Sequence, residues 1–301
     1  RYDYKKDGLT VNSTLNSNLQ LAAQNSLKKH LSKMQKQLDK LYYYGVSKRQ
    51  ISDLASKIAN REKLELSDLT EKERRLFYWE DVESEIKTTI KDSIIHTLRQ
   101  LHAGILALNP NNGAILTWVG GINFMYYPYD QILAKRQLAS TFKPFLYAEA
   151  LRKGRDVGDY ISNEPIELSD YNNWSPSNYD GKSGGSYSLA AALAYSKNIP
   201  TVHLYFETEL SSLAQLWNDL GFIGNLNEGP SVILGTNSVN ALELAVAYST
   251  FANNGKLVNP HTIESVYNQE GELIYKKEEA KGQRVLDVIT TKKINTILEK
   301  A

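Results

Sequence analysis

Two short groups of residues in this chain have the types and spacing that acyl transfer needs. Ser140 and Lys143 lie three positions apart, and a second serine, Ser196, is followed two positions later by Asn198. On a helix, side chains three positions apart share a face, so the Lys143 amine is expected directly beside the Ser140 hydroxyl. A serine becomes a good nucleophile when a base takes its proton, and a desolvated lysine amine is such a base. The pattern predicts Ser140 as a nucleophile and Lys143 as its base.

Ser196 and Asn198 fit supporting roles in the same chemistry. The Ser196 hydroxyl is suited to pass a proton between Lys143 and the amine that leaves or enters. The Asn198 amide carries both a donor and an acceptor, so it is suited to grip a substrate backbone amide and to orient Lys143. Lys197, between them, is predicted to face solvent.

Each of these residues also has a simpler interpretation. Serine is common at helix starts, so Ser140 alone would more often be a cap than a nucleophile. Lys143 alone would be read as a surface lysine, and residues 196–198 as the end of a helix. The surrounding segments decide in favour of chemistry.

Four segments resemble, in order and with fitting gaps, the transpeptidase domain of class A penicillin-binding proteins. The resemblance runs over most of residues 96–301. The segments are GILALNPNNGAILTWVGG (104–121), RQLASTFKPF (136–145), WSPSNYDGK (174–182), and LGT (234–236) followed by LELAVAYSTFANNG (242–255). A serine, a lysine three residues later and a Ser-x-Asn-type element belong to the signature of penicillin-binding proteins.

The resemblance implies a peptidoglycan D,D-transpeptidase that is a target of penicillin. Ser140 would attack the carbonyl of the penultimate D-Ala of a stem peptide, expel the terminal D-Ala and pass the acyl group to a neighbouring amine. β-Lactams would mimic the D-Ala-D-Ala end and stay bound as an ester. Lys143, Ser196 and Asn198 would be the other catalytic residues, and no cofactor is implied.

The family pattern also sets expectations beyond these residues. Its third motif, Lys-Thr-Gly on a strand lining the cleft, does not occur in the sequence and is expected to follow Ala301. One oxyanion-hole donor is expected from the Ser140 backbone and the other from that strand. An upstream glycosyltransferase domain and membrane anchor are expected, with the catalytic domain on the periplasmic, extracytoplasmic face of the bacterial cytoplasmic membrane. Cell-wall synthesis proteins are possible partners.

Two alternatives stay open at this point. A D,D-carboxypeptidase or serine β-lactamase would differ in letting water release the acyl group. A catalytically silent scaffold would bind wall-synthesis partners through residues 17–85. A Lys-Thr-Gly motif beyond Ala301 would argue against the scaffold.

Composition excludes several other classes of protein. The 301 residues are 42% apolar and 23% charged, which is ordinary for a globular protein with a real core. Lys and Arg total 35 against 34 Asp and Glu, so no basic field favours nucleic acid. The absence of cysteine excludes disulfides and thiolate sites, and no apolar run is long enough to span a membrane. No metal site is predicted, because the five histidines are scattered: His30, His96, His102, His203 and His261.

The periodicity of the sequence predicts an α+β fold, and the family fold it resembles is a central antiparallel sheet flanked by helices. We expect a first region over residues 1–95, with a linker strand and helices, and a transpeptidase domain over residues 96–301. Within the first, the expected elements are a strand at 8–14, a helix at 17–43, a helical insertion at 45–85 with a capping box from Thr70 to Glu73, and a helix through Ile86 and Leu98. Within the second, they are hairpins at 103–119 and 261–276 and helices starting near Ser140 and at 186–197, 209–220 and 239–253.

Overall fold

The computed structural model describes residues 2–3, 5–44, 47–67, 70–79, 85–279 and 282–301. The chain divides into two compact units that are interleaved in the sequence. One, the α1 unit, consists of Asn16–Ile105 and Thr117–Gln131; the other, the α4 unit, consists of Arg1–Leu15, Leu106–Leu116 and Ile132–Ala301. The predicted domain boundary between residues 95 and 96 stays a prediction.

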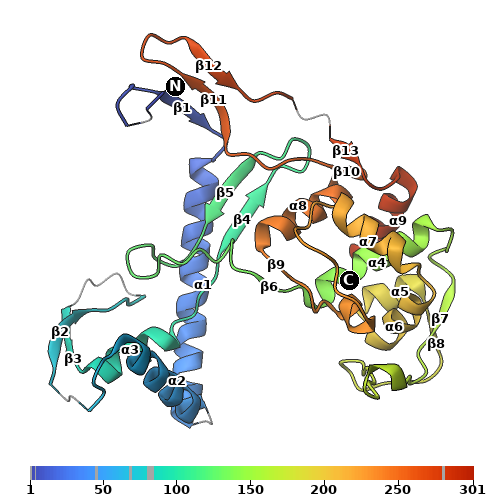
Figure 1. The fold of residues 1–301 in the computed structure, drawn as a ribbon, viewed down its shortest axis with the longest axis horizontal. Helices are drawn as coiled ribbons and strands as arrows, with labels where there is room; N and C mark the ends of the chain where they lie inside the picture. Colours follow the sequence, from blue (N-terminus) through green and yellow to red (C-terminus); the bar gives the residue numbers. More distant parts are fainter. Residues whose placement is uncertain (1, 4, 45–46, 68–69, 80–84, 280–281) are drawn as a thin grey trace. The chain divides into compact units, whose positions relative to one another are not determined.

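The α1 unit is built on one long helix (Figure 1). Its elements are α1 (Ser17–Tyr44), α2 (Ser47–Glu62), β2 (Lys72–Arg75), β3 (Glu85–Thr88) and α3 (Ile90–Arg99). The apolar stripe predicted along α1 is buried only at Leu27 and Leu31, which pack with Phe77, Trp79 and Val119. Met34 and Leu41, farther along the stripe, are exposed.

Beyond Leu31, the contact between α1 and the end of α3 is made by the buried side-chain amide of Gln35. Gln35 is 3% exposed, donates to the Arg99 carbonyl at 2.9 Å and accepts from the Leu101 amide at 2.9 Å. These bonds provide partners for backbone groups at the end of α3, because the last carbonyls of a helix have none within the helix.

The predicted helical insertion is partly wrong. The capping box expected from Thr70 to Glu73 starts no helix, because Lys72–Arg75 pair as strand β2 with Glu85–Thr88 of β3, with Arg74 opposite Ile86. The helix expected through Ile86 begins only at Ile90. Thr89 caps it, accepting from the Asp92 amide at 3.1 Å, and this threonine is the local signal in the sequence that marks the true start.

The α4 unit contains a three-stranded antiparallel sheet in the order β1 (Thr10–Ser13), β11 (Ile263–Tyr267) and β12 (Leu273–Lys276). Val266 is paired with Val11 on one side and Tyr275 on the other. The predicted strand within residues 8–14 and the predicted hairpin within 261–276 are therefore confirmed.

Further strands pair two by two. They are β4 (Ile105–Leu108) with β5 (Ile115–Val119), β6 (Arg136–Gln137) with β9 (Ser238–Val239), β7 (Tyr160–Ser162) with β8 (Ser186–Ser188), and β10 (Lys256–Leu257) with β13 (Gln283–Arg284). Asn109 and Ala114 close the hairpin expected within residues 103–119, with Asn109 donating to the Ala114 carbonyl at 2.8 Å.

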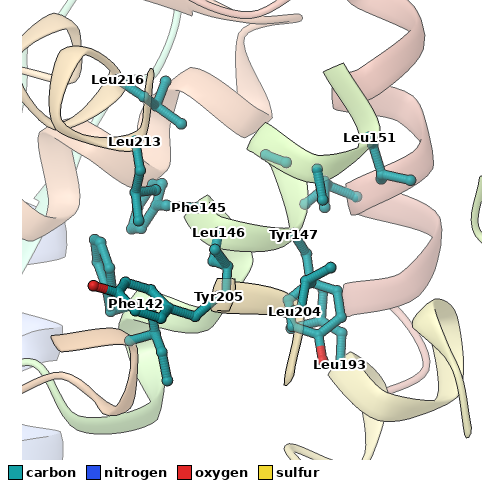
Figure 2. Close-up of a cluster of buried hydrophobic side chains, with 14 of the residues drawn as sticks. Phe142, Phe145, Leu146, Tyr147, Leu151, Leu193, Leu204, Tyr205, Leu213 and Leu216 are labelled. Carbon is teal, nitrogen blue, oxygen red and sulfur yellow. The ribbon is translucent and has the colours of Figure 1, made fainter. Parts of the chain in front are cut away.

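The helices of the α4 unit gather around one helix that is buried along nearly its whole length. They are α4 (Lys143–Arg152), α5 (Leu189–Ala194), α6 (Asn198–Phe206), α7 (Leu210–Asp219), α8 (Ala241–Ala252) and α9 (Val288–Leu298), with 3₁₀ turns η1 (Ala139–Phe142), η2 (Ser169–Tyr171) and η3 (Pro230–Leu234). Every residue of α4 from Lys143 to Leu151 is buried. A helix that is buried on every side belongs inside a core, and Figure 2 shows side chains of α4, α6 and α7 converging there.

Helices predicted at 209–220 and 239–253 are confirmed as α7 and α8. The helix predicted at 186–197 is shorter, because residues 186–188 form strand β8 against β7. Ser188 then caps α5, accepting from the Ala191 amide at 3.2 Å.

Phe145 of α4 tests how much this core contributes to stability. It is fully buried, with its ring 5.3 Å from Phe251, 5.3 Å from Tyr248 and 5.7 Å from Phe222. We expect Phe145→Ala to lower the free energy of unfolding by about 3–5 kcal/mol, measured by urea denaturation. Phe206→Ala, at a 48% exposed position, is the control and should change it by about 0.5 kcal/mol or less. Equal losses would contradict the burial argument.

Candidate active site

Ser140 lies at the turn that leads into the buried helix. It is exposed and belongs to the 3₁₀ turn η1, directly before α4 begins at Lys143. The Lys143 amide donates to the Ser140 carbonyl, so the turn continues into the helix. The predicted position of Ser140 near a helix start is confirmed, with a tighter turn than an α-helix provides.

The Lys143 side chain is buried and makes three hydrogen bonds to the second motif. It is 1% exposed, and its Nζ donates to the Ser196 carbonyl at 2.7 Å, to Ser196 Oγ at 3.1 Å and to Asn198 Oδ1 at 2.6 Å. Three of the four predicted catalytic residues therefore meet at one amine. Among the described residues, no hydrogen bond joins this amine to the Ser140 hydroxyl.

Burial changes the protonation of this lysine. Removal of the ammonium from water lowers the pKa of Lys143 from 10.5 to about 8. Roughly a tenth of the amine is then neutral at pH 7, far more than for an exposed lysine. A neutral fraction of this size is what a general base at Lys143 requires.

Ser196 sits at a bend between two helices. It follows α5 and precedes α6, with its amide donating to the Leu193 carbonyl at 2.9 Å and its side chain exposed. Its φ of 50° is left-handed, which is costly for a residue with a Cβ. In this conformation, both the carbonyl and the hydroxyl of Ser196 accept a hydrogen bond from Lys143.

Asn198 is fixed from both sides of its amide. Its Oδ1 accepts from Lys143, and its Nδ2 donates to the Ser177 carbonyl at 2.8 Å. These two bonds assign the amide orientation, and they leave one amide hydrogen and one lone pair for another group. The predicted role of Asn198 in orienting Lys143 agrees with this geometry and stays a proposal.

Asn178 supports the second motif, and its sequence context marked it only as one member of the WSPSNYDGK segment. It is 4% exposed, and its Oδ1 accepts from the Asn198 amide at 2.8 Å and the Ile199 amide at 3.0 Å. Its Nδ2 donates to Asn163 Oδ1 and to the Lys182 carbonyl, each at 2.7 Å. Asn178 therefore satisfies two free amides at the start of α6, which a helix cannot satisfy itself.

The prediction that Lys197 faces solvent is wrong. Its side chain is buried, with Nζ 2.6 Å from Asp180 Oδ2 and 5.1 Å from the centre of the Tyr187 ring. The hydrogen bond from Lys197 holds the pKa of Asp180 below its usual value, and the same bond raises the pKa of Lys197. This ion pair connects the start of α6 to the segment around Asp180, and the spacing of residues in the sequence did not predict it.

A glycine clamps the residue before the nucleophile candidate. Ala139 has a φ of 49°, and its amide donates to the Gly235 carbonyl at 3.0 Å. A Cβ on Gly235 would lie 2.0 Å from the Ala139 oxygen, so only glycine fits this approach. On the other side of the turn, the Tyr248 hydroxyl donates to the Thr141 carbonyl at 2.8 Å. The backbone around Ser140 is held from two helical segments.

The described residues offer no metal centre and no membrane span. Among them, no group of three or more His, Asp or Glu side chains is placed to hold a metal ion. None of the helices in the described part of the chain is both long and apolar enough to cross a lipid bilayer.

Gly235 gives a direct test of the clamp. We expect Gly235→Ala to destabilise the protein more than Gly271→Ala, by about 1–3 kcal/mol in urea unfolding, because its new methyl group must displace Ala139. Gly271 is a matched control, since its φ of 83° equals that of Gly235 within a degree and its Cβ would meet open space. Both variants share the left-handed penalty of about 1–2 kcal/mol. Equal destabilisation would show that the approach to Ala139 is not tight.

The structure is similar to solved penicillin-binding proteins. It aligns with penicillin-binding protein 1A from Haemophilus influenzae at a TM-score of 0.73 and 20% identity, over 97% of this chain and 54% of the other. It also aligns with PonA1 from Mycobacterium tuberculosis at a TM-score of 0.65 and 18% identity, over 98% of this chain and 64% of the other. At these identities the likeness is one of fold, and it confirms the predicted α+β class.

Sequence relatives agree with the structural ones. The chain is 31% identical over 191 residues to penicillin-binding protein 1A of Rickettsia bellii, covering 61% of this chain and 24% of the relative. It is 34% identical over 179 residues to penicillin-binding protein 1A of Neisseria meningitidis serogroup A, covering 58% and 22%. The chain thus spans about a quarter of the length of these relatives. The family profile described as the penicillin binding protein transpeptidase domain matches residues 103–301, and the chain belongs to this family.

Proposed function

We propose that this chain carries the transpeptidase centre of a bifunctional peptidoglycan synthase, with Ser140 as the nucleophile. The observation that supports it most is the buried Lys143 amine, which is held by both Ser196 and Asn198 at the start of a helix preceded by an exposed serine. The substrates are stem peptides ending in D-Ala-D-Ala, and the reaction cross-links the wall.

The first step forms an ester and releases an amino acid. Ser140 Oγ bonds to the carbonyl carbon of the penultimate D-Ala while its proton passes to neutral Lys143. The bond from that carbon to the terminal D-Ala nitrogen then breaks. The leaving nitrogen takes a proton from the Ser196 hydroxyl, which regains one from Lys143 at 3.1 Å. The acceptor amine of a second stem peptide reverses these transfers as it takes the acyl group.

Lys143 and Ser140 must come into contact for this step. Catalytic hydrogen bonds are often long or poorly aligned without substrate and tighten in the complex, so we expect this contact to form when substrate binds. Ser140 and Ser196 are both exposed residues beside a buried amine, which gives the substrate access while the base stays desolvated.

β-Lactams are proposed as inhibitors of the same centre. The PonA1 protein, which shares the fold, has been solved in complex with penicillin V. The remaining proposals concern the intact protein: a glycosyltransferase domain, a membrane anchor, a periplasmic catalytic domain and cell-wall synthesis partners. A carboxypeptidase, a β-lactamase or a silent scaffold has less support, because the relatives from Rickettsia bellii and Neisseria meningitidis are both named penicillin-binding protein 1A.

A fluorescent penicillin tests the nucleophile. We expect covalent labelling of the intact protein, read on a denaturing gel, to be lost in Ser140→Ala, because the ester has no other oxygen to form on. Ser211→Ala, which removes an exposed hydroxyl on α7, is the control and should label like the parent protein. Labelling that survives Ser140→Ala would remove Ser140 from the mechanism. An adduct that hydrolyses within seconds would favour a β-lactamase instead.

The pH dependence of acylation tests Lys143 as the base. Since burial lowers its pKa to about 8, the rate should rise tenfold per pH unit below this value and level off above it. Asn198→Asp places a carboxylate 2.6 Å from Nζ, favours the ammonium and should move the profile upward by about one pH unit or more.

The matched control for this shift is Asn218→Asp, which adds the same charge at an exposed position of α7. Its acylation profile should be that of the parent protein. A profile that stays flat from below to above about pH 8, or equal shifts in both variants, would exclude Lys143 as the titrating base.

A further inference from the structure

The α1 unit contains a pocket that the acyl-transfer chemistry does not use. It measures about 450 Å³ and lies between α1, Trp79 and residues 118–130. Its volume falls in the range of small-ligand sites. All its lining residues belong to the α1 unit, whereas Ser140, Lys143 and Ser196 belong to the α4 unit.

The lining is unusually aromatic. Five rings take part: Trp79, Trp118, Phe124, Tyr127 and Tyr129. Phe124 is 83% exposed and Tyr129 is 66% exposed, so both present their rings to solvent at the pocket. Exposed aromatic side chains that cluster at one pocket indicate a binding surface, whereas single scattered ones are normal on any protein.

The loop that carries these rings is anchored. Tyr126 and Tyr127 pack edge-on against Phe77, with ring centres 6.0 and 5.8 Å apart. The Asn123 side chain accepts from the Met125 amide at 2.9 Å, which fixes the turn at the loop tip. The loop therefore holds Phe124 in the open while its neighbours are packed.

Trp118 is held in place by a second set of contacts. Gln20 donates to the Trp118 carbonyl and accepts from its amide, each at 2.9 Å, and the indole Nε1 donates to Asp130 at 2.8 Å. A ring with its backbone and its polar edge both fixed loses little freedom when a ligand binds, which favours binding.

Polar and charged side chains complete the lining, namely Gln20, Gln24, Asn25, Lys28, Asn123 and Asp130. The exposed side-chain amides of Gln24 and Asn25 on α1 have no hydrogen-bond partner among the residues that the structure describes. Trp79 is 8% exposed, and its buried Nε1 also lacks a partner within the described part of the chain.

We propose that this pocket binds a saccharide, namely a β-linked chain of N-acetylated amino sugars. The C–H face of a sugar ring carries a partial positive charge that suits the negative face of an aromatic ring. Amide side chains both donate to and accept from sugar hydroxyl and acetamido groups. A glycan strand of this kind bears the stem peptides of the proposed reaction, and in that respect the inference rests on the proposed function.

Isothermal titration calorimetry with chitotetraose, a β-1,4-linked tetramer of N-acetylglucosamine, tests this site in the full chain. We expect saturable binding, weakened about three- to tenfold by Tyr129→Ala and by Phe124→Ala, because each removes one stacking ring. Met125→Ala is the matched control: it is 72% exposed in the same loop but does not line the pocket, so it should bind like the parent chain. Gln24→Ala should also weaken binding.

Three results would overturn the proposal. They are no saturable heat at millimolar probe, the same affinity in Tyr129→Ala as in the parent chain, or binding of a free stem pentapeptide in place of the sugar with the same sensitivity to Tyr129→Ala. The two exposed positions leave the packed core intact, and unchanged thermal unfolding of each variant checks this.

Penicillin labelling of the same variants separates this inference from the proposed function. Tyr129→Ala should label normally while binding the sugar less well. Sugar binding without any labelling of the parent protein would support the pocket and count against the acyl-transfer proposal.

Discussion

The desolvated amine of Lys143 is the interaction on which the candidate site depends. An ammonium group can be buried only if acceptors replace its water, and here Ser196 supplies two of them and Asn198 the third. These bonds join the first residue of α4 to the start of α6, so the same contact orients the base and connects two core helices. Only two of the three acceptors are side-chain atoms, Ser196 Oγ and Asn198 Oδ1, and the third is the Ser196 backbone carbonyl.

Strain in the backbone lies directly before Ser140 and at Ser196 itself. Ala139 and Ser196 are non-glycine residues with φ values of 49° and 50°, and such conformations persist only where neighbours impose them. Gly235 imposes the first through its close approach to Ala139, and Lys143 accompanies the second by binding two atoms of Ser196. The strained positions thus have identifiable restraints, and each restraint comes from a segment distant in the sequence.

The sequence identified candidate chemical groups but indicated only some of the contacts between them. The spacing of Ser140 and Lys143 fits a nucleophile and a base, but it fits a helix cap and a surface lysine equally well. The family segments favoured the chemical interpretation and also gave the class of fold. The expected link of Lys143 to Ser196 and Asn198 came from the second motif and not from helix spacing, because that contact depends on where α6 begins. The same limit explains Lys197, whose partner Asp180 lies in another segment. Local patterns describe one element at a time, whereas these contacts are set by packing between elements.

The secondary-structure prediction was wrong around residues 70–75 for the same reason. The capping pattern from Thr70 to Glu73 is real, yet pairing with residues 85–88 turns this stretch into a strand, because tertiary pairing outweighs a local preference. Where burial and periodicity agree, as in α7 and α8, the predicted helices are confirmed. The α4 helix marks the opposite extreme: even its charged residues Lys143 and Glu149 are buried, so only a surrounding core can specify it. A lysine at the start of such a helix is forced into the interior, and the perturbed pKa of Lys143 follows from the burial of the helix itself.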